Sequence, residues 1–384
     1  PEITDSEVLI RVSHAGICGS DQHVFHGEFT PRTTLPLIQG HEFAGTIVEV
    51  GKNASGFKVG DRVACAGSGM ASHAEVNLVP RTLAVRIPEN VSFEAASFVA
   101  LGAIAMHSVR MARVTFGERV AVLGLGLLGQ LGVQILKAAG CIVIGMDPNE
   151  GRCRLAEENG AEATATSAEE LGAKVHQHTQ GYGVDAVIIF AATESNEPVE
   201  LAAEVARERG KIVVPGLVGL DLPRKIFYEK ELDFAVSRAW GPGMYDPDYE
   251  AGKVDYPLSH VRWTAQGNMA HFLEMLSQGK VRVDHLVTHR FSFDRALEAY
   301  DLILKGKEPV MGVVLDYDKD TVSSASSQCQ VAEAQGNVSA YDRKVYLGEK
   351  REKTGNWKLK TGTVSVGLIG AGLFARGTLL PAMK

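Results

Sequence analysis

Residues 119–129 read Arg119-Val120-Ala121-Val122-Leu123-Gly124-Leu125-Gly126-Leu127-Leu128-Gly129. The first five residues have the length and composition of a short buried strand, and a G-x-G-x-x-G motif follows at once. In such a motif Gly124 permits the tight turn, Gly126 lets the backbone approach a pyrophosphate, and Gly129 lets the next helix pack close to the strand. The stretch predicts a dinucleotide-binding unit whose phosphates lie at a helix N-terminus.

The flanking sequence continues this pattern. Apolar residues at helical spacing predict a helix over residues 127–139, and residues 141–145 predict the next strand, which Asp147 closes. A carboxylate there can accept hydrogen bonds from a ribose diol and repel a 2′-phosphate, so NAD is favoured over NADP, although Arg152 weakens that preference slightly. A glycine-rich turn that only packs a helix on a sheet would not explain the carboxylate. The expected cofactor-binding residues are Gly124, Gly126, Leu127, Leu128, Gly129, Asp147 and Arg152.

Two more apolar runs lie further along, at residues 184–190 and 210–214. Continuous apolar runs of this length are typical of parallel strands that are buried on both faces. The fold class predicted here is therefore α/β, with a doubly wound parallel sheet.

A second motif lies nearer the start of the chain. Cys18-Gly19-Ser20-Asp21 is followed by Gly40-His41-Glu42, so a thiol, an imidazole and a carboxylate lie 23 and 24 residues apart. Catalytic zinc is usually held by three protein ligands of these types, with a fourth position open. A buried apolar cysteine and a structural histidine are the alternative for each residue alone.

Composition restricts the class of protein. The chain has 384 residues, 45% of them hydrophobic and 22% charged, and a formal net charge of −7. This acidic balance, without a clustered basic face, argues against a nucleic-acid or membrane partner. No apolar stretch approaches the ~18 residues that a spanning helix needs. The five scattered cysteines do not form a disulfide framework, which favours a cytoplasmic location.

Taken in order, Cys18-Gly19-Ser20-Asp21, Gly40-His41-Glu42, the turn Gly60-Asp61-Arg62-Val63 and the Gly124 motif resemble the zinc-dependent medium-chain dehydrogenases, and most closely their polyol and threonine dehydrogenase branch. The resemblance covers residues 1 to about 316. It implies a GroES-like catalytic domain split around a Rossmann domain: residues 1–102, then 103–240 for NAD, then a return segment over 241–316. It also implies a homo-oligomer and an enzyme in which a secondary alcohol, such as a polyol, sugar or sugar derivative, loses hydride to NAD.

The resemblance also assigns roles to residues. Cys18 and His41 are expected as zinc ligands, and Glu42 either as the third ligand or as a close carboxylate that exchanges with water. Ser20 is expected to receive the proton of the alcohol, and His23 to pass it to solvent, because an imidazole transfers protons near neutral pH. Asp21 is expected to orient His41.

The chain departs from the family pattern at two places. A further Cys or acidic ligand is expected near residues 99–102, where the sequence offers neither. The four-cysteine lobe of the family's structural zinc is also missing, so only one, catalytic, zinc is expected. Three alternatives stay open: a zinc-free NAD(P)-dependent reductase of the same superfamily, a nucleotide-binding module without chemistry, and an inactive fragment that serves as an interface.

The return segment opens with an insertion from Gly241 to Trp263 that is rich in aromatic, glycine and proline residues. One hypothesis is that Tyr245, Tyr249, Tyr256 and Trp263 line a substrate cleft. A surface loop or a subunit contact is the alternative.

The end of the chain differs in character. Residues 317–362 predict a polar linker, and residues 363–384 again combine a strand, a G-x-G-x-x-A motif and the start of a helix. This tail is similar to the opening of the Gfo/Idh/MocA sugar oxidoreductases, so the whole resembles a bidomain oxidoreductase that is truncated at both ends. An extra terminal hairpin of the same fold is the alternative.

Overall fold

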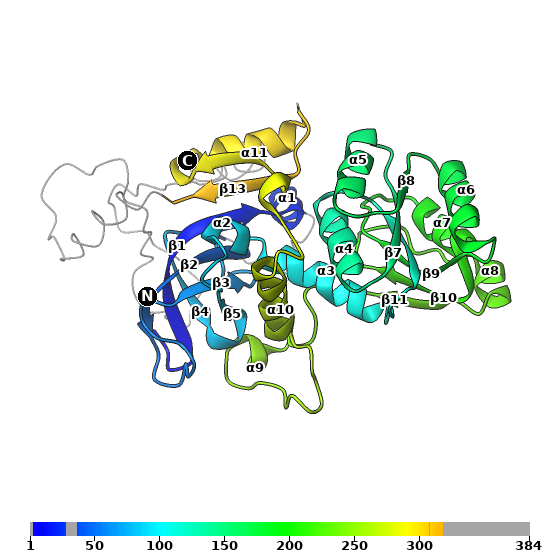
Figure 1. Cartoon of the computed structure of the whole chain (residues 1–384). Helices are drawn as coiled ribbons and strands as arrows, with labels where there is room; N and C mark the ends of the chain where they lie inside the picture. Colours follow the sequence, from blue (N-terminus) through cyan, green and yellow to red (C-terminus); the bar gives the residue numbers. More distant parts are fainter. Residues whose placement is uncertain (1–2, 28–36, 307, 318–384) are drawn as a thin grey trace, which may run out of the picture.

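The structure is a computed structural model, and it describes residues 3–27, 37–306 and 308–317. The described elements form two halves, each with its own sheet (Figure 1). The predicted linker, apart from residue 317, and the predicted second module lie outside the described residues.

The nucleotide half contains a six-stranded parallel sheet in the order β11-β10-β9-β6-β7-β8. The order reverses between β6 and β9, so the carboxyl end of β6 lies at the switch point where such sheets bind ligands. The predicted doubly wound sheet is confirmed. Its elements are β6 (Arg119–Leu123), α4 (Leu127–Ala138), β7 (Ile142–Met146), α5 (Glu150–Glu158), β8 (Ala163–Ala165), α6 (Ala168–Thr179), β9 (Val184–Ile189), α7 (Glu197–Val205), β10 (Ala206–Val214), α8 (Arg224–Glu229) and β11 (Asp233–Val236).

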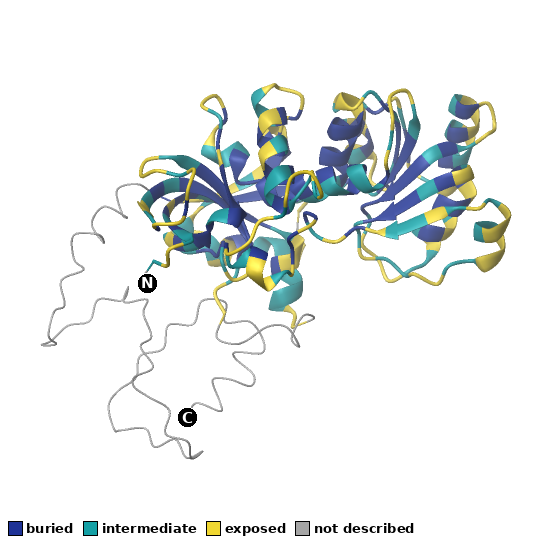
Figure 2. Cartoon of the chain, turned by 90° about the horizontal axis from the view of Figure 1, so that it is seen from below, coloured by how far each residue is buried: buried dark blue, intermediate teal, exposed yellow. Residues whose placement is uncertain are grey.

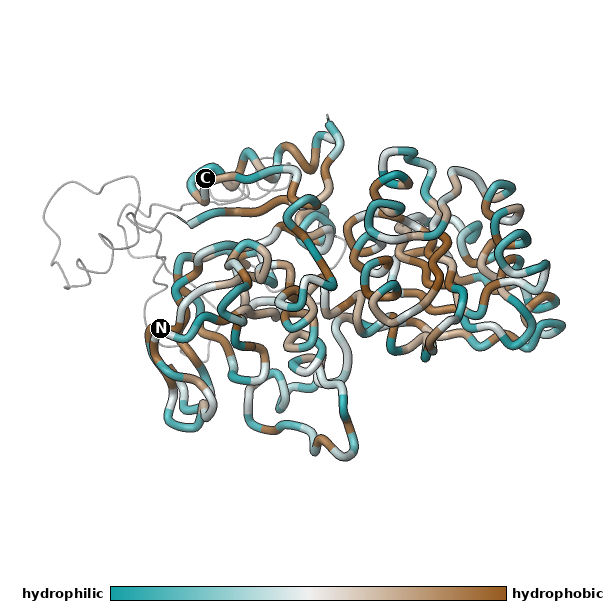
Figure 3. The backbone as a smooth tube through the Cα atoms, viewed as in Figure 1, coloured by the Kyte–Doolittle hydropathy of each residue, from teal (hydrophilic) through white to brown (hydrophobic). Residues whose placement is uncertain are grey.

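Burial explains why these strands are so apolar. Helices cover both faces of the sheet, and its central strands are the most hydrophobic part of this half (Figure 3). All four apolar residues at 120–123 in β6 are at most 2% exposed. Two strand starts differ from prediction: β7 begins one residue later, and β10 begins four residues earlier, at Ala206, where it already pairs with Val184 of β9.

The other half contains a seven-stranded sheet in the order β12-β13-β1-β2-β3-β5, with β4 paired to β1. The long β1 pairs antiparallel with β2, β4 and β13, so the return segment completes a sheet that the start of the chain begins. The elements are β1 (Glu7–Ile17), α1 (Gly19–Phe25), β2 (Glu42–Val50), β3 (Arg62–Ala66), β4 (Val76–Pro80), η2 (Arg81–Leu83), β5 (Ala84–Arg86), α2 (Phe93–Ala96), α3 (Val99–Met111), α9 (Pro247–Glu250), α10 (Ala265–Ser277), η3 (Asp284–Leu286), β12 (Val287–Ser292), η4 (Phe293–Arg295), α11 (Ala296–Lys305) and β13 (Gly312–Asp316).

Helix α3 joins the halves. It contacts β2 and β3 on one side and α4 and β10 on the other, and it packs against α10. The strands of both sheets and the helices between them carry most of the buried residues (Figure 2). None of the described helices is long and apolar enough to cross a membrane.

Side-chain hydrogen bonds also cross between the halves. The Gln134 amide of α4 donates to the Arg282 carbonyl (3.1 Å) and accepts from the Arg282 N–H (2.8 Å). A longer chain starts at Gln130, which accepts from Asn159 (2.9 Å). The side-chain oxygen Oδ1 of Asn159 in turn lies 2.8 Å from Nε2 of His285 in η3. The nucleotide half is therefore held to the return segment by specific polar contacts.

Candidate functional site

Cys18 lies between β1 and α1 and is the N-cap of α1. Its N–H donates to Oδ2 of Asp21 (2.9 Å), and Oδ1 of the same carboxylate accepts from the Gly40 N–H (3.1 Å). A side chain three residues into a helix that accepts from the N-cap backbone is a usual way to fix a helix start. Here Asp21 also brings the two motifs together.

His41 is anchored by the same carboxylate. Its Nδ1 lies 3.2 Å from Oδ1 of Asp21, so Nδ1–H donates, and Nε2 is the ring nitrogen that would bind a metal ion in place of its proton. Burial lowers the pKa of His41, but the negative charges of Cys18 and Asp21 outweigh burial and hold this pKa well above its ordinary value. Burial raises the pKa of Asp21, but the charge and hydrogen bond of His41, together with smaller contributions that include the Cys18 N–H, outweigh burial, so this pKa is lowered.

Glu42 is completely buried at the start of β2. Its Oε2 accepts from the Leu101 N–H at 3.4 Å, whereas Oε1 has no hydrogen-bond partner in the described part of the chain. Oε1 also lies 2.5 Å from where a Cβ on Gly16 would be, so the glycine makes room for this carboxylate. Burial raises the pKa of Glu42 to about 7. A buried carboxylate oxygen without a partner is costly, and a cation would satisfy it.

The expected further ligand has no counterpart. Residues 99–102 form the first turn of α3, and there the Leu101 backbone holds Glu42. Across the described ranges, no group of three or more His, Cys, Asp or Glu side chains is arranged so that it could already hold a metal ion. Cys18, His41 and Glu42 therefore have donor types that suit zinc, but they do not form a finished ligand set.

The two residues expected to move a proton both lie on α1. Ser20 is exposed, and its Oγ is 3.9 Å from Sγ of Cys18. His23 follows Ser20 by three residues, which places both side chains on one face of the helix.

Two further residues reach this site, and the sequence interpretation did not identify them. His73 is buried, with Nε2 3.0 Å from the Gly16 carbonyl oxygen. The hydroxyl of Tyr300 in α11 lies 3.2 Å from Nδ1 of the same ring. The only local sequence signal is a lone histidine in Ser72-His73-Ala74, and Tyr300 lies 227 residues further along.

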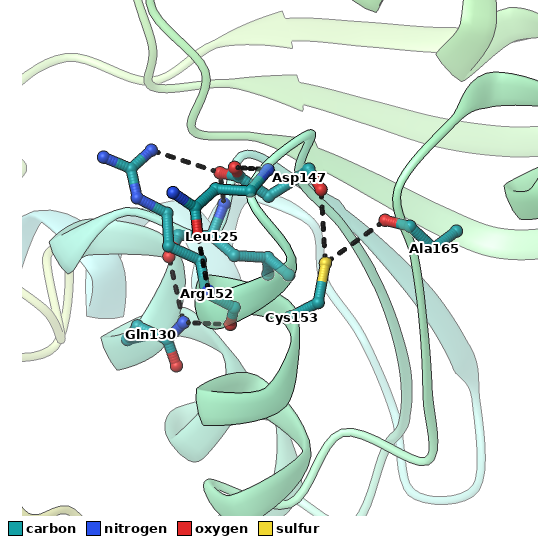
Figure 4. A network of polar contacts seen from close by, with 7 residues as sticks. Leu125, Gln130, Asp147, Arg152, Cys153 and Ala165 are labelled. Atoms are coloured by element: carbon teal, nitrogen blue, oxygen red, sulfur yellow. Dashed lines mark hydrogen bonds and ion pairs between the residues drawn. The ribbon is translucent and has the colours of Figure 1, made fainter.

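At the carboxyl end of β7, Asp147 holds the loop that follows β6. Its Oδ2 accepts from the Leu125 N–H (2.9 Å), and its Oδ1 accepts from the Asn149 N–H (2.9 Å). Nη1 of Arg152 lies 3.4 Å from Oδ2, and the arginine side chain is 42% exposed (Figure 4). Asp147 is 5% exposed, so most of the hydrogen-bonding capacity of its carboxylate is used within the protein.

The glycine motif has open space where a cofactor is expected. Gly124 has φ +90°, and a Cβ there would meet the Ala191 backbone at 2.6 Å. Gly126 is the N-cap of α4, and a Cβ on it would meet nothing within 4 Å. Leu127, Leu128 and Gly129 form the first turn of α4, and Gly129 packs against the carbonyl of Gly124. A free helix start at the switch point suits a pyrophosphate.

Three of the four aromatic residues expected at the cleft, Tyr249, Tyr256 and Trp263, pack against other side chains. Tyr249 is 1% exposed and stacks on Tyr256 with ring centroids 5.5 Å apart, so it has no face for a substrate. The Trp263 ring lies under the guanidinium of Arg110 at 3.3 Å from its centroid. Tyr245 is 55% exposed.

Comparisons with known proteins bear on both halves. Residues 4–89 match the alcohol dehydrogenase GroES-like domain, and residues 128–247 match the zinc-binding dehydrogenase family. An alcohol dehydrogenase of Geobacillus stearothermophilus is 31% identical over 255 residues, which are 59% of this chain and 74% of that protein. D-arabitol-phosphate dehydrogenase of Enterococcus avium is 28% identical over 342 residues, 80% of this chain and 90% of that protein.

Solved structures agree. A zinc-binding dehydrogenase from Sinorhizobium meliloti, bound to NADP, superimposes with a TM-score of 0.66 at 26% identity, covering 82% of this chain and 93% of that chain. Galactitol-1-phosphate dehydrogenase from Escherichia coli, at 23% identity and a TM-score of 0.68, shares the fold over 82% of this chain and 94% of its own. The predicted combination of a GroES-like and a Rossmann fold is confirmed. The chain therefore belongs to the zinc-dependent medium-chain dehydrogenases, as an alcohol dehydrogenase-like oxidoreductase that uses NAD(P).

Proposed function

We propose that this chain binds one catalytic zinc ion and uses NAD⁺ to oxidise a secondary alcohol to a ketone. The observation that supports a metal ion is the buried Oε1 of Glu42, which has no hydrogen-bond partner among the described residues. Glu42 is the residue next to His41. Cys18, His41 and Glu42 would hold the ion. Oε2 of Glu42 accepts only a long backbone hydrogen bond of 3.4 Å, so Oε1 would be the oxygen that binds the ion.

The proposal for NAD rests on Asp147. Its negative charge lies at the end of β7, beside the open helix start, and would oppose a 2′-phosphate. Arg152 is the one cation that pairs with this carboxylate within the described ranges, and it only partly reduces the repulsion between Asp147 and a 2′-phosphate. The remaining cofactor contacts would come from the main chain of Gly124, Gly126, Leu127, Leu128 and Gly129.

The chemistry follows from the side chains around Cys18. A zinc ion, when bound, polarises the alcohol, and NAD⁺ accepts the hydride. Ser20 Oγ would receive the hydroxyl proton, because it is exposed and lies beside Cys18 Sγ. His23, one turn further along α1, would pass the proton to solvent. Asp21 would keep Nδ1 of His41 protonated, so that Nε2 faces the ion.

The substrate class is a polyol, a sugar or a sugar derivative. The support for this class is the similarity to proteins named D-arabitol-phosphate dehydrogenase and D-xylulose reductase. The domain bounds, the cytoplasmic location and a homo-oligomer stay predictions. Sedimentation of the purified chain would test the oligomer.

Elemental analysis of the purified chain tests the metal. We expect about one zinc per chain, lost in Cys18→Ala and kept in the control Cys141→Ala, which removes a buried thiol of the nucleotide half. Cys18→Ala should also abolish NAD⁺-dependent oxidation of polyols and leave NAD⁺ binding intact. Zinc retained in Cys18→Ala would contradict the proposed ligand set.

A zinc-free reductase of the same superfamily is the second candidate. It is favoured by the lack of a Cys or acidic residue at 99–102 and of a finished group of three ligands in the described part of the chain. Turnover that resists chelators, by protein that contains no zinc, would select it. NAD binding without any turnover would instead indicate a nucleotide-binding module.

A further inference from the structure

His73 connects the two segments that carry the proposed ligands. Its N–H donates to the Gln39 carbonyl at 2.7 Å, and its Nε2 lies 3.0 Å from the Gly16 carbonyl oxygen. Gly16 precedes Cys18 by two residues, and Gln39 precedes His41 by two residues. The single buried residue His73 therefore bridges both segments, and in each segment its contact lies two residues before the proposed ligand.

The fit around His73 is close. A Cβ on Gly40 would lie 2.5 Å from Cδ2 of the His73 ring and 2.6 Å from its backbone nitrogen. Gly40 also has φ +105°, which L side chains rarely adopt. The turn before His41 therefore lies directly against His73, and a movement of His73 would also move His41.

Tyr300 fixes the orientation of the His73 ring. The Gly16 carbonyl can only accept, so Nε2 carries the hydrogen and Nδ1 accepts from the Tyr300 hydroxyl. Burial lowers the pKa of His73 and raises the pKa of Tyr300, which keeps both groups neutral as this arrangement requires. The Tyr300 ring also contacts Phe25, the last residue of α1, with centroids 6.4 Å apart.

We propose that His73 and Tyr300 are positioning residues that set the separation of Cys18 and His41 for the metal ion. The inference rests on the proposed zinc site. A purely packing role would be served by an apolar ring, whereas here both ring nitrogens of a buried imidazole have directed partners. Buried polar networks of this kind restrict a site to one geometry.

The test compares three variants with the wild-type chain. His73→Leu removes both side-chain contacts, Tyr300→Phe removes only the hydroxyl, and His73→Gln keeps an amide that can donate to Gly16. Thr82→Val is the matched control, because it removes a buried hydrogen bond of 2.6 Å to Tyr249 in the same half and touches neither ligand segment. The readouts are zinc affinity against a chelating dye, the visible spectrum of the Co²⁺-substituted protein, and NAD⁺ binding.

We expect His73→Leu to weaken zinc affinity by about 10- to 100-fold and to shift the Co²⁺ bands, with NAD⁺ binding unchanged. Tyr300→Phe should give a smaller loss, and His73→Gln should restore most of the affinity. If His73→Leu does not fold, the other two variants decide.

Two results would overturn the inference. One is wild-type zinc affinity and wild-type Co²⁺ bands in the His73 and Tyr300 variants. The other is an equal loss of zinc affinity in Thr82→Val, which would mean that any destabilisation of this half of the chain weakens zinc binding to the same extent. A wild-type chain that binds no zinc would refute the proposed function and this inference together, whereas a zinc-binding wild type with unaffected variants would refute the inference alone.

Discussion

The substitution Asp147→Asn tests the proposed cofactor preference with little change of shape. Asp147 accepts two backbone hydrogen bonds at 2.9 Å, from Leu125 and Asn149. An asparagine keeps one accepting oxygen and turns an NH₂ group toward the other donor. Loss of one charge-assisted bond costs about 2 kcal/mol, and an unsatisfied buried N–H adds about 1 kcal/mol. The free energy of unfolding should therefore fall by about 3 kcal/mol.

The same substitution removes a charge that opposes a 2′-phosphate. Two unit charges about 5 Å apart interact by about 3 kcal/mol at an effective dielectric constant near 20. Since about 1.4 kcal/mol corresponds to a factor of ten, the ratio of kcat/KM for NAD⁺ to that for NADP⁺ should fall by about 100-fold.

Steady-state kinetics with both cofactors and urea unfolding measure the two effects. Asp185→Asn is the control, because Asp185 accepts from the Arg119 N–H (2.8 Å) and from Arg207 (2.7 Å) at the opposite end of the same sheet. The control should lose comparable stability and keep the cofactor ratio. A ratio that does not change in Asp147→Asn would refute the reasoning and leave Asp147 with a structural role only.

Three further predictions concern other contacts. Gly16→Ala places a Cβ 2.5 Å from Oε1 of Glu42, so it should cost about 1–3 kcal/mol of stability and lower zinc content; full zinc content would contradict the assigned role of the carboxylate. Arg290 lowers the pKa of Glu94, so this pair stabilises the fold above pH 4.5 and the effect is lost as pH falls. Glu94→Gln should therefore reduce the free energy of unfolding by about 0.5–1 kcal/mol at pH 7, and a difference that persists undiminished at acid pH would be inconsistent with this. Gln134→Ala should cost about 2–3 kcal/mol, measured by urea unfolding, because it leaves an N–H and a C=O of the opposite half unpaired; a loss below 0.5 kcal/mol would argue against that contact.

Local patterns were sufficient to predict the core of the nucleotide half. The apolar run at 119–123 is β6 with the same bounds, because a buried parallel strand needs apolar side chains on both faces. The helix predicted over 127–139 ends at Ala138, within the usual variation of helix ends. The strand predicted over 210–214 was too short, because its first residues, 207–209, are polar and partly exposed although they continue the sheet.

The candidate site was only partly predictable. Cys18, Asp21 and His41 lie in short motifs of known chemistry, and the structure brings Asp21 to both partners. His73 could not be found in this way, because its partners are main-chain atoms of Gly16 and Gln39, which leave no pattern of side chains. Its contact with Tyr300 depends on how the return segment folds back, which no local signal encodes.

The polar contacts between the halves limit how this enzyme can be recombined. A chimera that takes its nucleotide-binding half from a relative with another cofactor preference would inherit the glycine loop and the strand-end carboxylate. It would also separate Gln134 from Arg282, and Asn159 from His285, since one partner of each pair lies beyond the graft. The part that can be exchanged as a unit is thus larger than the sheet itself, and it includes the segment around residues 282–285.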